Sequence, residues 1–512
     1  MSPRDLLTSE SRTQRLDLDQ VLGAEAPDRL TLACTAYLLL PGLMFLGGWA
    51  QTWAALLAGG AAVVSLALSP GWRGAWPEGL RTTLLCLACG LLWAAFTGAQ
   101  HWIYATADWQ VRDAVLRDLA SYPWPVAYDE EVVWLLRAPL GFFLPAGLVG
   151  RSAGFAASQV ALWLWTGLGL ALVLLLLSRL ARAGKVELAS LAALFLVFGG
   201  VDILPNIVLD HLYGTGPLAS WGRGGEWWAR AFQYPGHVTS LLWAPNHTMP
   251  AWLGALMLLR HGRTGGFAAS LALPLAAGAF WSPVSTAGAA LLGGIWVLQV
   301  RQLKAALLSP ANWLALVFAA PICLYLIAGS GQVPHGWVFM IRPPLEAAWR
   351  WPLFLLVEVL VWAVPAAFLV RGHRFGAAVA LLCLLPAYVF GPGNEAASRG
   401  SQAALAVLAV VAGIAMLQPR PSLARTALRV VAALALLGSV MEASLLVTKD
   451  PWNASTNCTV PEAARQSVFR ESTDWSHYFA PWPEPTLQMW LQPPHPRPIP
   501  ERSPNCWPDG SV

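Results

Sequence analysis

Long runs of apolar residues, separated by short polar turns, dominate the hydropathy pattern of this chain. Most runs approach the roughly 17–25 residues that an α-helix needs to cross the ~30 Å hydrocarbon core of a bilayer. The pattern therefore predicts an all-α membrane protein, a polytopic bundle of about thirteen transmembrane helices. The predicted spans are 30–48, 53–69, 82–98, 157–178, 188–204, 247–260, 266–281, 284–300, 311–329, 352–370, 375–391, 402–417 and 427–447.

Basic residues alternate with the spans in a regular way. If the N-terminus is cytoplasmic, every predicted inside turn contains Arg or Lys, whereas the short outside turns near 49–52 and 281–284 carry no charge. Excess Lys and Arg mark the cytoplasmic loops of membrane proteins. The basic residues of the inside turns are Arg73, Arg81, Arg179, Arg182, Lys185, Arg260, Arg263, Arg301, Lys304, Arg371, Arg374, Arg420, Arg425 and Arg429.

This orientation divides the chain into three parts. Residues 1–29 form a polar cytoplasmic leader without a secretory h-region. The transmembrane bundle, 30–447, carries three long outside loops at 99–156, 205–246 and 330–351. Residues 448–512 form an extracytoplasmic tail that is rich in Pro and Trp and too short for a large core of its own.

Composition supports the membrane class and excludes others. The chain is 56% hydrophobic and 12% charged, which is about half the usual charge content of a soluble protein. The net charge is +4, and the basic residues, nearly all Arg, are scattered along the chain. This pattern does not indicate a nucleic-acid partner. No Walker A loop, dinucleotide fingerprint or zinc-type spacing is found. The abundance of Arg, Ala, Gly and Pro is typical of a bacterial protein, so we expect the bacterial inner membrane.

Two of the seven cysteines lie in the predicted outside tail. Cys458 and Cys506 would form a disulfide in an oxidising periplasm, or they would remain free thiols. The other five lie in apolar runs, where cysteine acts as a small hydrophobic residue.

The first outside loop opens with the charged stretch 108-DWQVRDAVLRDL-119. As a helix it carries an apolar stripe of Val111, Val115 and Leu119. Asp108 precedes the first turn as a potential N-cap. The pairs Asp108/Arg112 and Asp113/Arg117 are spaced for ion pairs one turn apart. One interpretation is a capped, salt-bridged helix that lies on the outer leaflet.

A second interpretation gives this stretch a catalytic role. Asp108 lies about ten residues beyond a span, so its carboxylate could act as a general base at the membrane surface; Asp113 is the second choice. Arginine binds phosphate through paired N–H donors. This chemistry fits transfer of a sugar from a polyprenyl-phosphate carrier to a cell-envelope glycan or lipid acceptor. The candidate lipid-phosphate ligands are Arg112, Arg117, Arg137, Arg342 and Arg399.

The arrangement resembles the GT-C superfamily of multi-spanning glycosyltransferases, which carry a functional acidic residue in the first large outside loop. Topological resemblance covers about 30–450, and motif resemblance covers about 105–150, including 122-YPWPVAYDEE-131. The segment 134–150, interrupted by prolines, is interpreted as a re-entrant or surface helix. The resemblance implies a transferase that uses a lipid-phosphate-linked sugar, with Asp108 at the position of the family's loop carboxylate. It leaves a divalent metal open, because some members use one and others do not.

Other polar residues near the predicted outer surface are candidate substrate ligands. They are Trp109, Asp210, His211, Trp243 and His247. The alternative for His247 is a surface residue beside an N-capping Asn246. Asp202 lies in a predicted span end, where a carboxylate is costly and usually functional. Asp210 and His211 are adjacent and point in different directions on a helix, which argues against a metal site.

Two further function classes remain open. A transporter or flippase for a lipid-linked substrate would show charged or broken helices near the bilayer midplane. A noncatalytic membrane scaffold would use the outside loops and the tail to bind an assembly partner. The sequence favours the enzyme over the transporter, because it shows no convincing internal repeat and its predicted spans are nearly free of charge at mid-depth.

Overall fold

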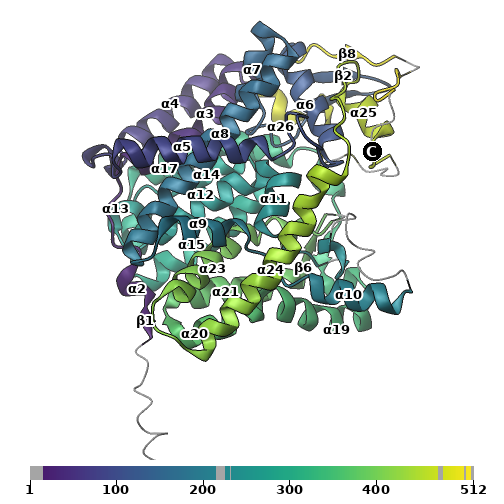
Figure 1. Ribbon diagram of the computed structural model, residues 1–512. Helices are drawn as coiled ribbons and strands as arrows, with labels where there is room; N and C mark the ends of the chain where they lie inside the picture. Colours follow the sequence, from purple (N-terminus) through teal and green to yellow (C-terminus); the bar gives the residue numbers. More distant parts are fainter. Residues whose placement is uncertain are drawn as a thin grey trace, which may run out of the picture.

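The computed structural model describes residues 15–214, 225–230, 232–391, 393–470, 475, 477–500 and 503–508. The described chain is mostly helical, with a few short strands (Figure 1). Six helical stretches are long and apolar enough to cross a membrane, which indicates a membrane protein. They are α3 (Arg29–Trp49), α8 (Phe155–Ala183), α17 (Pro310–Ile327), α19 to α20 (Pro344–Leu369), α22 to α23 (Glu395–Leu417) and α24 (Leu423–Thr448).

The predicted count of thirteen spans is not confirmed. Several predicted spans are helices of 10–17 residues, and at ~1.5 Å per residue a helix of 16 residues covers only about 24 Å. The run 188–204 ends as a helix before Gly199 and Gly200, and 266–281 breaks into two short helices. These shorter helices are α4 (Thr52–Ala67), α5 (Leu80–Ala95), α9 (Leu188–Leu196), α12 (Pro245–His261), α13 (Gly265–Ala268), α14 (Ala272–Ala279), α15 (Pro283–Gln299) and α21 (His373–Leu384).

The described ends of the chain lie at opposite ends of the bundle (Figure 1). We call the end that carries residues 15–28 the leader end, and the end that carries the described residues after Thr448 the tail end. At the leader end, β1 (Leu16–Asp17) pairs with β5 (Val370–Arg371), and α2 (Leu18–Val21) follows it. Asp19 accepts a hydrogen bond from Arg374 Nε at 2.8 Å. Acidic leader residues thus pair with basic residues of the turns.

At the tail end, the predicted loop 99–156 and the tail fold together (Figure 1). Their strands form a four-stranded sheet in the order β7-β3-β2-β8. The strands are β2 (Ala127–Asp129), β3 (Val133–Leu136), β7 (Phe479–Trp482) and β8 (Arg497–Pro498). The interpretation of 134–150 as one helix was wrong, because its first residues pair as a strand with the tail and only α7 (Leu144–Ala153) is helical.

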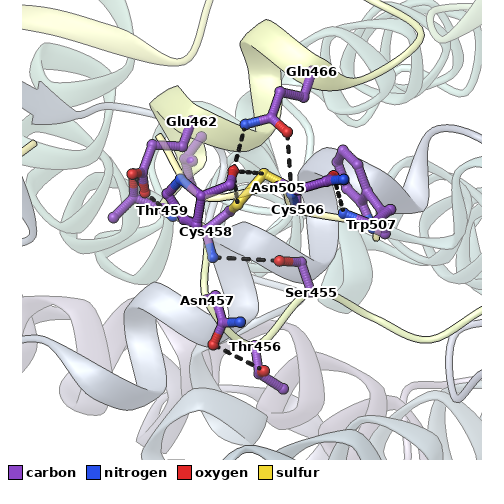
Figure 2. The surroundings of a disulfide bond; sticks show 12 residues. Ser455, Thr456, Asn457, Cys458, Thr459, Glu462, Gln466, Asn505, Cys506 and Trp507 are labelled. Carbon is purple, nitrogen blue, oxygen red and sulfur yellow. Dashed lines mark hydrogen bonds between the residues drawn. A yellow bond between two sulfur atoms is a disulfide. The ribbon is translucent and has the colours of Figure 1, made fainter. Parts of the chain in front are cut away.

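A disulfide between Cys458 and Cys506 closes the tail (Figure 2). Gln466, at the end of α25 (Val460–Gln466), supports the bond by accepting from Cys506 N at 3.0 Å and donating to Pro504 O at 2.9 Å. Helix α25 begins with a capping box of Thr459 and Glu462. Of the two alternatives for these cysteines, the structure therefore contains the disulfide.

Candidate functional site

Helix α6 (Trp109–Ser121) follows the acidic residue at the centre of the enzyme hypothesis. It has the predicted apolar stripe, but its polar face is buried too, and only Arg117 and Ser121 keep appreciable exposure. Helices α7, α8 and α25 all pack against it. The interpretation of a helix on the outer leaflet was wrong, because protein rather than lipid headgroups covers its polar face.

Asp108 and Arg112 form the predicted ion pair one turn apart. Arg112 Nη2 donates to Asp108 Oδ2 at 2.7 Å, with 8% and 26% of the two side chains exposed, respectively. The predicted N-cap is wrong, since Asp108 has helical backbone angles and its side chain bonds no helix N–H group. The buried guanidinium therefore holds a partly exposed carboxylate at the start of α6.

The start of α6 is fixed against the segment that leads into α12. Trp109 Nε1 and Thr106 Oγ1 each donate to Leu242 O at 3.2 Å. Trp109 is fully buried, and its ring lies 5.8 Å from the Arg112 guanidinium carbon. Trp109 therefore positions Arg112 and is not exposed to a ligand from solvent.

The Asp108–Arg112 pair interacts electrostatically with residues far away in the sequence. The charges of Asp108, Arg112 and Arg399 all act on Tyr478. Burial raises the pKa of the Tyr478 phenol. The two arginines act to lower this pKa, and Asp108 acts to raise it. The charges of Arg399 and Arg112 also reach His247. The structure thus brings four predicted site residues, Asp108, Arg112, Arg399 and His247, into one neighbourhood.

Helices α12, α15 and α23 (Gln402–Leu417) pack against each other. His247 Nδ1 lies 2.9 Å from Ser282 Oγ, which caps α15. A Cβ on Gly288 would lie 2.0 Å from Gly400 O, so α15 also meets the start of α23. The positive ends of the α12 and α15 dipoles therefore lie together, and the charges of Arg399 and Arg112 reach His247 there, which favours an anion.

Four polar side chains at this level each keep an atom without a hydrogen-bond partner among the described residues. The atoms are Arg112 Nη1, Asn246 Oδ1, Ser401 Oγ and Gln402 Oε1, and all four residues are more than nine-tenths buried. Each such atom costs about 1–3 kcal/mol unless something pairs with it.

The interpretation of His247 as a surface residue beside an N-capping Asn246 was also wrong. His247 is 5% exposed, and Asn246 is not the N-cap of α12.

Asp113, the second candidate base, lies in a different environment. Its Oδ2 is 2.7 Å from His101 Nε2, and it is 1% exposed. Burial raises the pKa of Asp113 against the opposing charges of His101 and Arg112. Burial lowers the pKa of His101, but Asp113 outweighs this and the net pKa is raised. This enclosed pair favours Asp108 over Asp113 as a group that reaches substrate.

The predicted Asp113–Arg117 pair is wrong. Arg117 Nη1 donates instead to Asp118 Oδ1 at 2.8 Å, and its Nε donates to Thr456 O. Asp118 also accepts from Tyr128 and from Val460 N. Arg117 therefore joins α6 to the tail and does not face the Asp108 site.

Arg137, another predicted phosphate ligand, follows β3. Its backbone N–H donates to Tyr478 O at 2.7 Å, which places the end of β3 beside Tyr478. Its Nη1 donates to Leu326 O at 2.8 Å, near the end of α17. Arg137 thus borders the Asp108 neighbourhood through its main chain, while its guanidinium supports α17.

Arg342, the last predicted phosphate ligand, is half-buried and follows α18 (Val338–Ile341). Helix α18 lies next to the two-stranded antiparallel sheet of β4 (His335–Trp337) and β6 (Tyr388–Phe390). Helix α22 (Glu395–Ser398) packs on β6 and leads to Arg399. This two-stranded sheet therefore links Arg342 to Arg399.

Asp210, His211 and Trp243 lie away from the Asp108–Arg112 pair or face another group. Asp210 is buried on α10 (Ile203–Leu212), a helix that packs on α24, and His211 is exposed at its end. Figure 1 shows α10 well separated from α6. Trp243 Nε1 donates to Glu442 Oε2 at 3.3 Å. The structure therefore does not bring these three residues together with Asp108.

A second polar cluster consists of four buried carboxyl groups, those of Asp202, Glu226, Glu358 and Glu442. Asp202 hydrogen-bonds to Glu358, which lies in η4 (Leu356–Leu360), a π-helical turn between α19 and α20. Burial, and then the charges of Asp202 and Glu442, raise the pKa of Glu226 well above its ordinary value. No Lys or Arg of the described chain forms a salt bridge with any of the four.

Of these four acids, the sequence pointed to Asp202, at a predicted span end, and to Glu226, among aromatic residues of a predicted outside loop. The signal for two others was present, because Glu358 and Glu442 are acids inside predicted spans 352–370 and 427–447. Donors surround them: Trp228 Nε1 bonds Asp202 at 2.7 Å, and Gly225 N bonds Glu442 at 2.9 Å. In the described ranges, no group of three or more His, Cys, Asp or Glu residues is arranged to hold a metal ion.

Comparisons with known proteins add no family assignment. No protein-family model matches the chain, and searches of curated proteins and of solved structures found no similar protein.

Proposed function

We propose that the chain is a membrane glycosyltransferase that moves a sugar from a polyprenyl-phosphate-linked donor to a cell-envelope glycan or lipid acceptor on the outer face of the bacterial inner membrane. One observation carries the proposal. A partly exposed carboxylate, Asp108, is held by a buried arginine, Arg112, and the charges of this pair and of a second arginine, Arg399, all act on Tyr478. A base next to two phosphate ligands is the combination that glycosyl transfer from a lipid phosphate requires.

The reaction follows from the position of these groups. The acceptor hydroxyl attacks the anomeric carbon on the face opposite the phosphate, and Asp108 takes its proton. The bond between the anomeric carbon and the phosphate oxygen breaks, and its electron pair leaves with the polyprenyl phosphate. Arg112 and Arg399, with the N-terminal ends of α12 and α15, stabilise the charge that develops on this leaving group. The product is inverted at the anomeric carbon.

The sidedness of the protein is part of the proposal. The turns at the leader end carry the basic residues that favour the cytoplasm, and the acidic leader pairs with Arg371 and Arg374. The tail end carries the disulfide, which suits an oxidising compartment. Asp108 lies at the tail end, so the proposed orientation puts it on the side where extracytoplasmic acceptors are found.

The proposal is tested with purified protein in proteoliposomes. The donors are polyprenyl phosphates that carry a radiolabelled sugar, and the acceptor is a lipid and glycan extract of a bacterial envelope. We expect release of polyprenyl phosphate and transfer of label to the acceptor. Absence of release from a panel of sugar donors, with protein that is folded by its thermal unfolding, would overturn the proposal.

One observation favours a transporter or flippase as the second candidate. Glu358 and Glu442 are buried carboxyl groups inside two of the candidate spans, and Glu358 lies where the helix is locally π-helical. Intramembrane acids and interrupted helices are typical of proton-coupled transporters. A flippase would move a fluorescent lipid-linked sugar between leaflets without releasing its phosphate, whereas the proposed enzyme releases it.

A further inference from the structure

We infer that the buried polar groups at the starts of α12 and α23 bind the hydroxyl groups of an uncharged sugar on the lipid-phosphate donor. The inference rests on the proposed function and names its substrate class. The site consists of Asn246, His247, Ser401 and Gln402, which we call the polar floor. Its members are 0–6% exposed.

The chemistry of the polar floor matches a neutral polyol. Asn246 Oδ1 and Gln402 Oε1 are acceptors, and Ser401 Oγ both donates and accepts. Among the described residues, none of these three atoms has a hydrogen-bond partner. Sugar hydroxyl groups supply the donors that two amide oxygens need. A hexuronic acid would instead bring its carboxylate against those oxygens, and repulsion would disfavour it.

His247 is positioned to take part as a neutral group. Its Nδ1 is fixed by Ser282, whose hydroxyl also bonds Ser285 at 2.9 Å. Burial disfavours a positive charge on the imidazole, and the charges of Arg399 and Arg112 add to this. Neutral imidazole offers one donor or acceptor to a hydroxyl group without adding charge.

The charged groups lie next to the polar floor and not within it. Asp108, Arg112 and Arg399 share the surroundings of Tyr478, and Glu395 pairs with Arg399 at 3.9 Å. Asn246 lies in the first turn of α12, and Ser401 and Gln402 are at the start of α23. This order places the phosphate at the arginines and its sugar against the amides and hydroxyls, so one donor molecule can satisfy both.

The test compares three probes by calorimetry with the purified full chain: farnesyl phosphate, its neutral hexosyl form and its hexuronic form. We expect wild type to bind the hexosyl form at least tenfold more tightly than farnesyl phosphate. The hexuronic form should bind no more tightly than farnesyl phosphate. Asn246→Leu and Gln402→Leu should each reduce the hexosyl preference to threefold or less and leave the affinity for farnesyl phosphate unchanged. Gln299→Leu, at the leader end of α15, is the matched control.

The outcomes distinguish a failure of the inference alone from a failure of the proposed function. If both variants keep the full hexosyl preference, or if the hexuronic form binds more tightly than the hexosyl form, the polar floor does not bind a neutral sugar. If wild type binds none of the three probes, the proposed function fails and the inference fails with it. Unchanged affinity for farnesyl phosphate shows that a variant is folded, and two variants guard against the loss of one.

Discussion

Arg112 Nη2 donates to Asp108 Oδ2 at 2.7 Å across one turn at the start of α6. The two partners differ in exposure, since the guanidinium is buried and a quarter of the carboxylate side chain reaches the surface. Arg112 keeps a second terminal nitrogen, Nη1, without a partner among the described residues. One arginine can therefore orient the carboxylate and still offer a donor to a phosphate.

The orientation predicts which surface positions react from outside. Lys185 is exposed in a turn after α8, and Val468 is exposed in the tail. In cells that carry the protein in the inner membrane, we expect Val468→Cys to react with a membrane-impermeant maleimide added outside. Lys185→Cys should react only after the membrane is permeabilised. Labelling in the reverse pattern would place Asp108 on the cytoplasmic side.

Arg260 at the leader end holds two leader acids. It is 3% exposed, donates to Glu25 Oε2 at 2.6 Å and also pairs with Asp28. Arg260→Gln leaves buried Asp28 without its cation and leaves Glu25 with Arg179 alone, so we expect a loss of about 3 kcal/mol in the free energy of unfolding. Exposed Arg263 is the control, and Arg263→Gln should cost less than about 1 kcal/mol. Equal melting temperatures for the two variants would contradict this role of Arg260.

The disulfide predicts a local effect of reduction. Cys458 and Cys506 are 48 residues apart, and closing such a loop is worth about 4 kcal/mol in the chain-entropy model. A reductant, or the double substitution Cys458→Ser and Cys506→Ser, should make the tail sensitive to protease while the bundle stays protected. Mass spectrometry of the fragments locates the cuts. Tail resistance that survives reduction would show that the sheet with β3 holds the tail alone.

The His101–Asp113 pair predicts a dependence of stability on pH. Both folded-state pKa values are raised above unfolded values of about 6.5 for His and about 3.9 for Asp. A raised pKa contributes stability below the unfolded value and loses it as the pH rises through the folded value. The buried acid Asp118, with a pKa raised to about 6 by burial, acts in the same direction.

We therefore expect the melting temperature of wild type to fall as the pH rises above about 6.5 and through the raised pKa of His101. In Asp113→Asn the imidazole of His101 loses the charge that raised its pKa, so this fall should be smaller. Exposed Asp450 supplies the control Asp450→Asn, which should follow wild type. A pH profile of Asp113→Asn that coincides with that of wild type would show that the pair does not hold the proton.

Local patterns predicted local structure well. The apolar runs mark where helices form, because helix burial depends on residues a few positions apart. The Asp108–Arg112 pair was predicted correctly for the same reason, since both groups lie on one turn. The Asp113–Arg117 pair failed, because each residue found a stronger partner outside that turn, His101 for Asp113 and Asp118 for Arg117.

Contacts between distant segments could not be read from these patterns. Strand β3 pairs with β7, whose residues lie more than 340 positions later. The predicted ligands Arg399 and His247 come near Arg112 only through packing of α12, α15 and α23. Of the polar floor, the sequence predicted His247 as a substrate ligand but not Ser401 and Gln402, because single Ser and Gln residues at helix starts usually cap helices or face water.

The most direct measurement is the rate of sugar transfer by purified Asp108→Asn in the proteoliposome assay. The amide keeps the size of the side chain but takes up no proton, and Glu130→Gln, in the exposed pair with Arg465, is the control. We expect Asp108→Asn to bind the donor as wild type does and to transfer sugar at least ~100-fold more slowly, within the usual contribution of a general base. A rate within a few-fold of wild type would contradict the assignment of Asp108 as the base.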